Sequence, residues 1–165
     1  MSWFKKEHQK VITPQAFANI LLRLTVDNVK DARQTFQKHL NSNERRSSKL
    51  IKVNEELAFF FVFALDYWWT MDSRRSREER DIVRQIFVTN MAEFVSLEML
   101  QERLIAYAQI INEVKGDNAK FTGFGMKLSE FCGMPHAFFL VLAPALFTKA
   151  GESLESLKSV RLKLR

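Results

Sequence analysis

The chain has 165 residues, of which 47% are hydrophobic and 27% are charged, so it has enough apolar surface to build a core and is not intrinsically disordered. Its five glycines and three prolines are too few for the many tight turns of an all-β protein, and long helices are expected instead. The formal net charge is +6, and the single cysteine, Cys132, excludes an internal disulfide, which favours a reducing, cytoplasmic location.

Thr13 and Pro14 mark the start of the first predicted helix. The Thr13 hydroxyl can cap a helix N-terminus, and proline suits the first helical position because the N–H that it lacks has no partner there. Residues 1–13 are therefore predicted to form an N-terminal arm. The helix is expected to continue to about Leu40, with a bend or break near residues 25–28, because its early and late apolar residues do not share one stripe.

The second predicted helix, near residues 45–70, is strongly apolar. Asp66 is the only charged residue between Leu57 and Trp69. The stretch is too short to cross a membrane, which takes roughly 20 apolar residues, so we expect no transmembrane segment. A helix that is apolar on nearly all sides belongs instead at the centre of a bundle.

Arginines cluster directly after this helix. Arginine near a helix N-terminus opposes the helix dipole, so it calls for an acidic neighbour or an anionic ligand. We therefore name Arg74, Arg75 and Arg77 as candidates for contact with an anion, although nearby carboxylates can supply most of the neutralisation. A buried Asp66 would also need an arginine or several N–H donors, and Arg74, Arg75 or a residue of the basic first helix could serve.

A capping box at Ser76 and Glu79 predicts the start of a third helix. In such a box the serine hydroxyl accepts a hydrogen bond from the glutamate N–H, and the glutamate carboxylate accepts one from the serine N–H. Helical spacing of apolar residues then continues to Val114, and Gly116 is a suitable stop. Because this length is unusual for one globular helix, Ser96 is a candidate joint.

The rest of the chain is predicted to hold two shorter helices and a tail. Residues 116–125 are expected to be a loop leading into a helix that ends at Cys132, where Gly133 can adopt the left-handed conformation of a helix terminus. The next helix, near residues 135–148, is again apolar. The C-terminal tail, residues 152–165, combines helical spacing with the alternation of a strand, so both conformations stay open.

Together these elements predict an all-α protein, a single-domain helical bundle of five to seven helices over residues 1–165. The apolar helices near residues 45–70 and 135–148 are expected at its centre, with the long third helix packed along them. Basic residues gather toward both ends of the chain and acidic residues between them, which suits neutralisation within the chain or across a subunit interface. Because no helix-turn-helix is visible, we do not expect nucleic acid binding.

The sequence gives few signs of catalytic or metal-binding chemistry. It has no Cys-x-x-Cys, His-Glu-x-x-His or Glu-x-x-His pattern, so neither a metal site nor a cofactor is predicted. Cys132 and His136 are four residues apart, but glycine and proline lie between them and cysteine is commonly buried, so a nucleophilic pair is not expected. No catalytic residue is therefore named, and an enzyme is the less favoured interpretation.

The many phenylalanines have two interpretations. Aromatic residues at helical spacing usually form plain core, because protein interiors pack densely. They can also line a cavity for an apolar small molecule, since such cavities are rich in aromatic side chains. The candidate lining residues are Phe59, Phe63, Tyr67, Phe138 and Phe139.

These observations favour a non-enzymatic helical interaction or regulatory protein. Aromatic residues and methionine are enriched at the centres of protein interfaces, so we expect the chain to act as a homodimer or through a protein partner. The alternative is a carrier or sensor that binds an apolar small molecule among the phenylalanines. The pathway and the identity of a partner do not follow from the residues.

Overall fold

The computed structural model describes residues 10–45, 49–135 and 137–164. It confirms the all-α prediction, because seven helices pack against one another within these residues and account for most of them. The helices are α1 (Pro14–Lys38), α2 (Ser42–Arg45), α3 (Lys49–Met71), α4 (Arg77–Met91), α5 (Leu97–Glu113), α6 (Asp117–Cys132) and α7 (Phe139–Ser156). None of the described helices combines the length and the apolar character that a membrane span requires.

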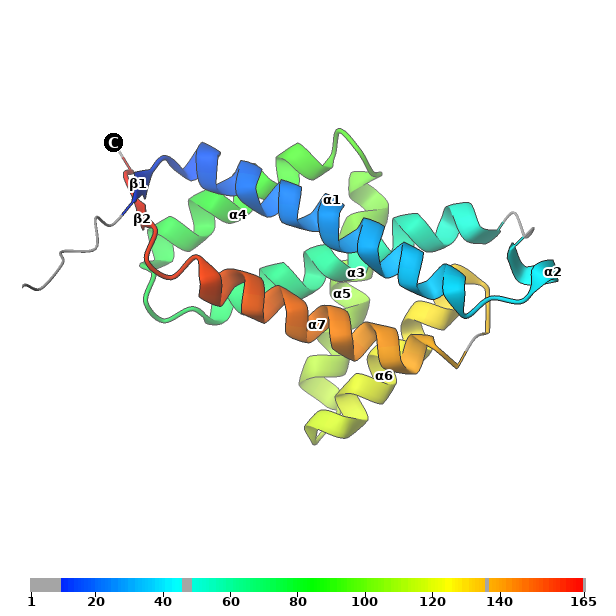
Figure 1. Cartoon of the computed structure of the whole chain (residues 1–165). Helices are drawn as coiled ribbons and strands as arrows, with labels where there is room; N and C mark the ends of the chain where they lie inside the picture. Colours follow the sequence, from blue (N-terminus) through cyan, green and yellow to red (C-terminus); the bar gives the residue numbers. More distant parts are fainter. Residues whose placement is uncertain (1–9, 46–48, 136, 165) are drawn as a thin grey trace, which may run out of the picture.

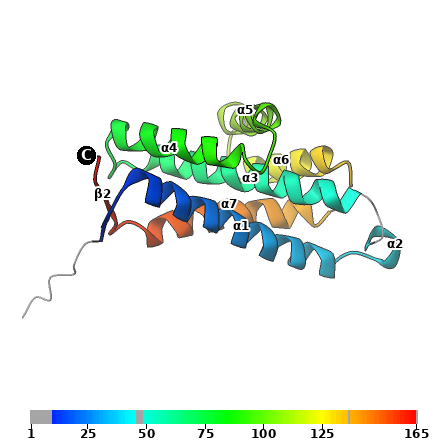
Figure 2. The ribbon, with the colours of Figure 1, turned by 90° about the horizontal axis from the view of Figure 1, so that it is seen from above.

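Helix α3 lies at the centre of the bundle, as its composition predicts. Figure 2 shows it between α1 and α7 on one side and α4 and α5 on the other, and α6 packs on it as well. Phe59, Phe60 and Phe61 follow one another along α3, and all three are buried. Three successive buried side chains point in different directions from a helix, so α3 must be covered on several sides.

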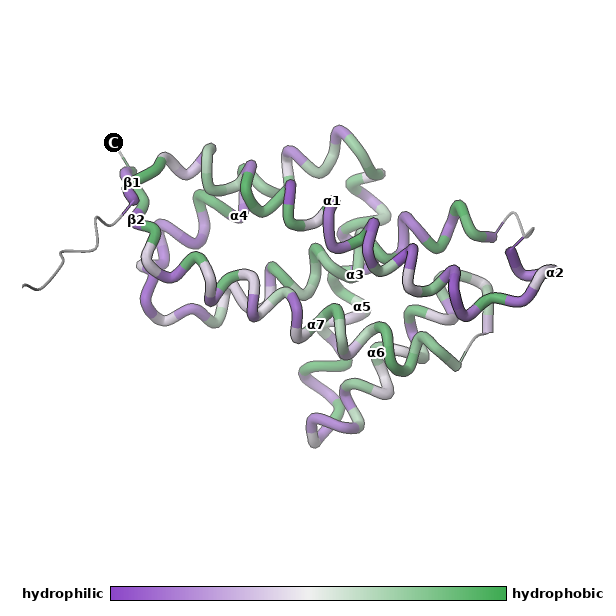
Figure 3. Tube along the Cα trace, viewed as in Figure 1, coloured by the Kyte–Doolittle hydropathy of each residue, from purple (hydrophilic) through white to green (hydrophobic). Residues whose placement is uncertain are grey.

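Hydrophobic residues are distributed differently among the helices (Figure 3). They dominate the middle of α3 and much of α7, whereas hydrophilic residues alternate with them along α1. An alternating helix buries one stripe and exposes the other, so α1 can form an outer wall of the bundle. The second apolar segment, predicted near residues 135–148, is α7, and it packs along α3.

Helix α1 is continuous, so of the bend or break expected near residues 25–28 the break does not occur. Its N-terminus is capped as predicted, with the Thr13 hydroxyl accepting a hydrogen bond from the Ala16 N–H at 3.1 Å. The Thr25 hydroxyl donates to a backbone carbonyl one turn earlier at 2.9 Å, and the Asn28 amide does the same at 2.8 Å. These polar side chains are satisfied within the helix, and the backbone pattern is not interrupted.

The predicted third helix is two helices joined at Ser96. Both hydrogen bonds of the Ser76–Glu79 capping box are present, at 3.1 and 2.8 Å. Helix α4 ends at Met91, and the Ser96 hydroxyl then caps α5 by accepting a hydrogen bond from the Met99 N–H. After this joint α5 crosses α3 instead of continuing along α4 (Figure 1). The expectation of one long helix packed along the centre is therefore wrong.

The loop predicted at residues 116–125 is also wrong, because this segment forms the first half of α6. Its glycines allow close helix packing. A Cβ atom on Gly125 would lie 2.7 Å from the Cα of Leu140 and 2.8 Å from the carbonyl oxygen of Phe139 in α7. The predicted end of the helix is confirmed, since Gly133 has a φ of 59° in the left-handed region.

The C-terminal tail contains both of the conformations that its pattern allows. Helix α7 passes Gly151 and ends at Ser156, so the first part of the tail is helical. A short strand, β2 (Arg161–Leu162), then pairs in parallel with β1 (Val11–Ile12). Of the predicted N-terminal arm, residues 1–9 lie outside the described part of the chain, and β1 belongs to the remainder.

Candidate interaction site

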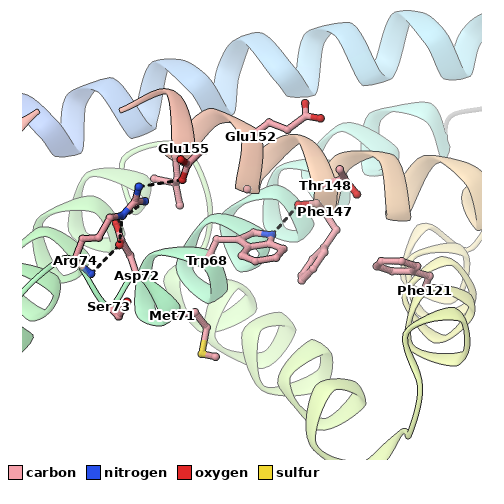
Figure 4. A pocket seen from close by; sticks show the side chains of 12 residues that line it. Trp68, Met71, Asp72, Ser73, Arg74, Phe121, Phe147, Thr148, Glu152 and Glu155 are labelled. Atoms are coloured by element: carbon pink, nitrogen blue, oxygen red, sulfur yellow. Dashed lines mark hydrogen bonds and ion pairs between the residues drawn. The ribbon is translucent and has the colours of Figure 1, made fainter. Parts of the chain in front are cut away.

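A groove of about 770 Å³ opens at the C-terminal end of α3 (Figure 4). Its sides come from α3, the turn that follows it, α6 and α7. We call it the aromatic groove, and its lining residues are Trp68, Met71, Asp72, Ser73, Arg74, Phe121, Phe147, Thr148, Gly151, Glu152, Leu154 and Glu155.

Trp68 is held in a fixed position in this groove. Its indole N–H donates a hydrogen bond of 2.9 Å to the carbonyl oxygen of Phe147 (Figure 4). The ring also lies directly against Gly151, where a Cβ atom would be only 3.0 Å from the indole Cε2. Trp68 nevertheless remains 37% exposed. The groove therefore presents an apolar surface that is already ordered before anything binds.

Aromatic contacts connect the groove to the core. The Phe147 ring lies 5.4 Å from the Trp68 ring and 5.2 Å from the Phe124 ring, measured between centroids. Phe124 is fully buried and contacts Phe60 of α3 at 5.5 Å. At the opposite edge of the groove Met71 is 61% exposed and free to adapt its shape. The part of the groove formed by Trp68 and Phe147 is thus rigid, whereas the Met71 side chain at its other edge can change conformation.

Charged residues of both signs form the rim. Arg74 bonds to Asp72 at 2.7 Å and to Glu155 at 3.0 Å, which ties the turn after α3 to the end of α7. Burial alone would raise the pKa of Asp72, but the hydrogen bonds and charge of Arg74 outweigh it and lower this pKa. A hydrogen bond from Lys158 and the charge of Arg74 lower the pKa of Glu155. Both carboxylates are therefore ionised at neutral pH.

The three predicted anion contacts do not converge on one point. Arg74 is occupied by the rim carboxylates just described. The guanidinium group of Arg75 is buried, 5.7 Å from the Phe17 ring centroid and 5.8 Å from that of Trp69. Arg77 is exposed and lies near a carboxylate one turn further along α4. In this arrangement Arg74 and Arg75 stabilise the fold, and Arg77 is the most exposed of the three.

The five predicted pocket residues fall into separate groups. Phe59 and Phe139 are fully buried in the core, and Phe138 is half-buried near the start of α7. Phe63 and Tyr67 line a second groove of about 590 Å³ beside α5. This last pair therefore borders a space that a ligand could enter.

The second groove also contains the partner of Asp66. Arg84 of α4 forms a bidentate ion pair with Asp66, with distances of 2.6 and 3.1 Å. The expectation that Arg74, Arg75 or the first helix would supply this partner is wrong. The turn between α3 and α4 folds α4 back toward α3, which brings a residue 18 positions later to the carboxylate.

A buried ion pair between Glu56 and Arg103 was not expected from the sequence. Glu56 has 0% exposure, and its carboxylate accepts two hydrogen bonds from Arg103, at 2.8 and 2.9 Å. The guanidinium carbon also lies 3.8 Å from the centroid of the Phe131 ring. The only sequence signal is a glutamate at the edge of an apolar run, followed much later by an arginine inside an apolar pattern.

Cys132 does not have the environment of a nucleophile. It is fully buried, and desolvation raises its pKa to about 12, so the thiol is protonated at neutral pH. His136, its neighbour in the sequence, lies outside the described residues. Among the residues that the structure describes, no group of three or more His, Cys, Asp or Glu side chains is placed to hold a metal ion.

The aromatic groove combines features that protein interfaces share. It has a fixed tryptophan, an exposed methionine and a charged rim around an apolar centre. These features come from three separate segments of the chain, so they arise only in the folded protein. Comparisons with protein-family models, with curated proteins and with solved structures each find no match for this chain.

Proposed function

We propose that this chain is a non-enzymatic interaction or regulatory protein that acts as a homodimer through the aromatic groove. The observation that carries the proposal is the fixed and partly exposed ring of Trp68 at the centre of an open apolar groove. Tryptophan is enriched among the residues that dominate binding energy, and an ordered side chain loses little entropy on binding.

The charges on the rim support a second copy of the chain as the partner. A two-fold axis brings the same patch of both subunits together, so a patch that pairs with itself needs both signs of charge. Arg74 stands beside Asp72, Glu152 and Glu155 around this groove. The chain carries a net charge of +6, so two copies repel each other. This repulsion is weakest between surfaces that contain acidic groups, as the rim of the aromatic groove does.

A carrier or sensor for an apolar small molecule is the second candidate. The groove beside α5 supports it, because Phe63 and Tyr67 line a space of about 590 Å³, within the roughly 300–1,000 Å³ of typical ligand sites.

A cytoplasmic location is part of both proposals. It fits a chain whose single thiol is buried and protonated.

Sedimentation velocity over a concentration series tests the dimer. Met71→Glu places a carboxylate in the apolar contact without disturbing the core, and it should weaken the dimer at least about tenfold. Ile51→Glu is the matched control, because Ile51 is an exposed apolar residue at the other end of the same helix. The dissociation constant of its dimer should equal that of the wild type.

Two results would contradict the dimer proposal. One is a wild-type chain that remains monomeric up to a concentration of about 1 mM, which corresponds to a very weak contact. The other is equal weakening by the Met71 and Ile51 variants, because that would place the contact elsewhere or make it a general effect of charge.

A further inference from the structure

A separate groove of about 340 Å³ lies between α1, α3 and the turn that joins α4 to α5. We call it the α1 groove. Its lining residues are Leu22, Thr25, Val26, Val29, Lys30, Arg33, Asn54, Glu55, Ala58, Met91, Phe94 and Val95. The α1 groove and the aromatic groove share no lining residue, so a ligand here would not compete directly with a dimer.

One end of the α1 groove is apolar. A hydrogen bond of 3.2 Å from Asn90 to Asn19 holds the end of α4 beside the first half of α1. The residues directly after Asn90 therefore lie beside the apolar residues directly after Asn19. Phe94 is 63% exposed at this end, and Val26 across from it is also exposed. Two large apolar side chains open to solvent in one groove are typical of a binding surface.

The other end of the α1 groove is polar. Helix α3 runs in the opposite direction to α1 (Figure 1), so Asn54 and Glu55 lie beside the later part of α1, where Lys30 and Arg33 stand. Neither cation forms an ion pair with any of the residues that the structure describes. Glu55 offsets one of the two positive charges, which leaves a local excess of one.

Asn54 supplies a second polar feature. Its side-chain oxygen is buried and accepts no hydrogen bond from the described residues. A buried acceptor without a donor is unfavourable, because it has lost its water and gained nothing in return. An N–H or O–H donor on an occupant of the groove would relieve this.

We propose that the α1 groove binds a single-chain amphiphile of the N-acyl amino acid class. The acyl chain lies along the apolar end, the amide N–H donates to the Asn54 side-chain oxygen, and the carboxylate contacts Lys30 and Arg33. The path along α1 from Leu22 to Arg33 is about 16 Å long at 1.5 Å per residue. This path holds the head group and most of an extended dodecanoyl chain, whose end passes beyond Leu22.

The alternatives fit these observations less well. The backbone N–H groups of a partner helix are already bonded within that helix, so along its length only a side chain could supply the donor for Asn54. A helix is also about 10 Å or more wide. A groove with a volume of about 340 Å³ is small for a segment of that width. A bilayer surface would attract the two cations but would leave the Asn54 oxygen unpaired.

Isothermal titration calorimetry with three matched amphiphiles, each below its micelle concentration, tests the proposal. N-dodecanoylglycine should bind best. N-dodecanoylsarcosine has the same chain and carboxylate but no amide N–H, and it should bind about fivefold more weakly. Dodecyltrimethylammonium has a positive head group and should not bind measurably.

Variants of the groove residues separate the two polar contacts. The double variant Lys30→Gln, Arg33→Gln should raise the dissociation constant for N-dodecanoylglycine about tenfold. The control is Arg23→Gln, Lys38→Gln, which removes two exposed charges from the same helix and should leave binding unchanged. Asn54→Ala should abolish the difference between the glycine and sarcosine ligands while retaining binding of both.

Three outcomes would overturn the inference. The first is equal affinity for all three amphiphiles, which would indicate adsorption to exposed apolar surface. The second is equal weakening by the Lys30, Arg33 variant and its control, which would indicate a general charge effect. The third is binding to phosphatidylglycerol vesicles without binding to free N-dodecanoylglycine, which would assign the groove to a membrane surface.

Discussion

Arg103 of α5 and Glu56 of α3 form a bidentate ion pair inside the protein, with Nε to Oε2 and Nη2 to Oε1 distances of 2.8 and 2.9 Å. Glu102 bonds to the remaining nitrogen of the same guanidinium at 2.7 Å. Because α5 crosses α3 near this point, the pair fixes one helix on the other. It also raises the pKa of Arg103 through the hydrogen bond to Glu56, so the arginine stays charged.

Removing one partner of this pair should be strongly destabilising. Arg103→Met leaves a buried carboxylate without a cation, and we expect a loss of about 3–5 kcal/mol in the free energy of unfolding. The double variant Glu56→Leu, Arg103→Met has no unpaired charge and should recover most of this loss. Urea unfolding followed by circular dichroism measures both values. Equal stability of the single and double variants would show that the charge is not the cause.

Two glycines of α6 should respond in opposite ways to alanine. At Gly125 the added methyl group would meet the backbone of α7, which cannot move aside, so we expect a loss of roughly 1–3 kcal/mol. At Gly123 it would lie 3.0 Å from the Cγ2 atom of Ile110, a side-chain contact that a shift of a few tenths of an ångström relieves. Alanine is the better helix former by about 1 kcal/mol, so Gly123→Ala should be neutral or stabilising. Thermal melts of the two variants test the prediction.

The Cys132 thiol should resist alkylation in the folded protein. It is fully buried and protonated at neutral pH, and alkylation requires an accessible thiolate. Iodoacetamide at pH 8 should therefore label the chain only after urea is added, as measured by intact mass. Rapid labelling of the native protein would show that this part of the core opens readily.

The stability of the protein should fall in alkaline solution. The folded-state pKa of Cys132 is raised from 9.0 to about 12, so above pH 9 the unfolded chain releases its proton first. Stability contributed by this group is therefore present below pH 9 and is lost as the pH rises toward 12. Desolvation raises the pKa of Tyr107 as well and acts in the same direction. In urea titrations Cys132→Ala should show a smaller decline across this range than the wild type.

The sequence predicts local features of this fold better than long-range ones. The capping box at Ser76, the helix terminus at Gly133 and the central position of α3 follow from neighbouring residues and from apolar content. The Glu56–Arg103 pair joins residues 47 positions apart, and no pattern of neighbouring residues predicts it. The glycines of residues 116–125 suggest a turn, whereas the structure uses them for close packing.

The candidate sites depend even more on the arrangement of the helices. Phe63 and Tyr67 border a groove because α5 crosses α3 at an angle, which follows from the joint at Ser96. Phe59 has the same apolar character in the same helix but is covered by its neighbours. Helical spacing alone cannot separate these cases, because it gives the direction of a side chain and not what covers it.

The pairing of β1 with β2 has a consequence for the order of folding. Val11 lies opposite Arg161, so forming this contact closes a very long loop, and such contacts form late. Hydrogen bonds from the Arg161 and Lys163 amides join the two strands, and one residue of each strand, Val11 and Arg161, is exposed. Hydrogen exchange at these amides should therefore be faster than in the middle of α3, reporting a local opening that leaves the helices intact.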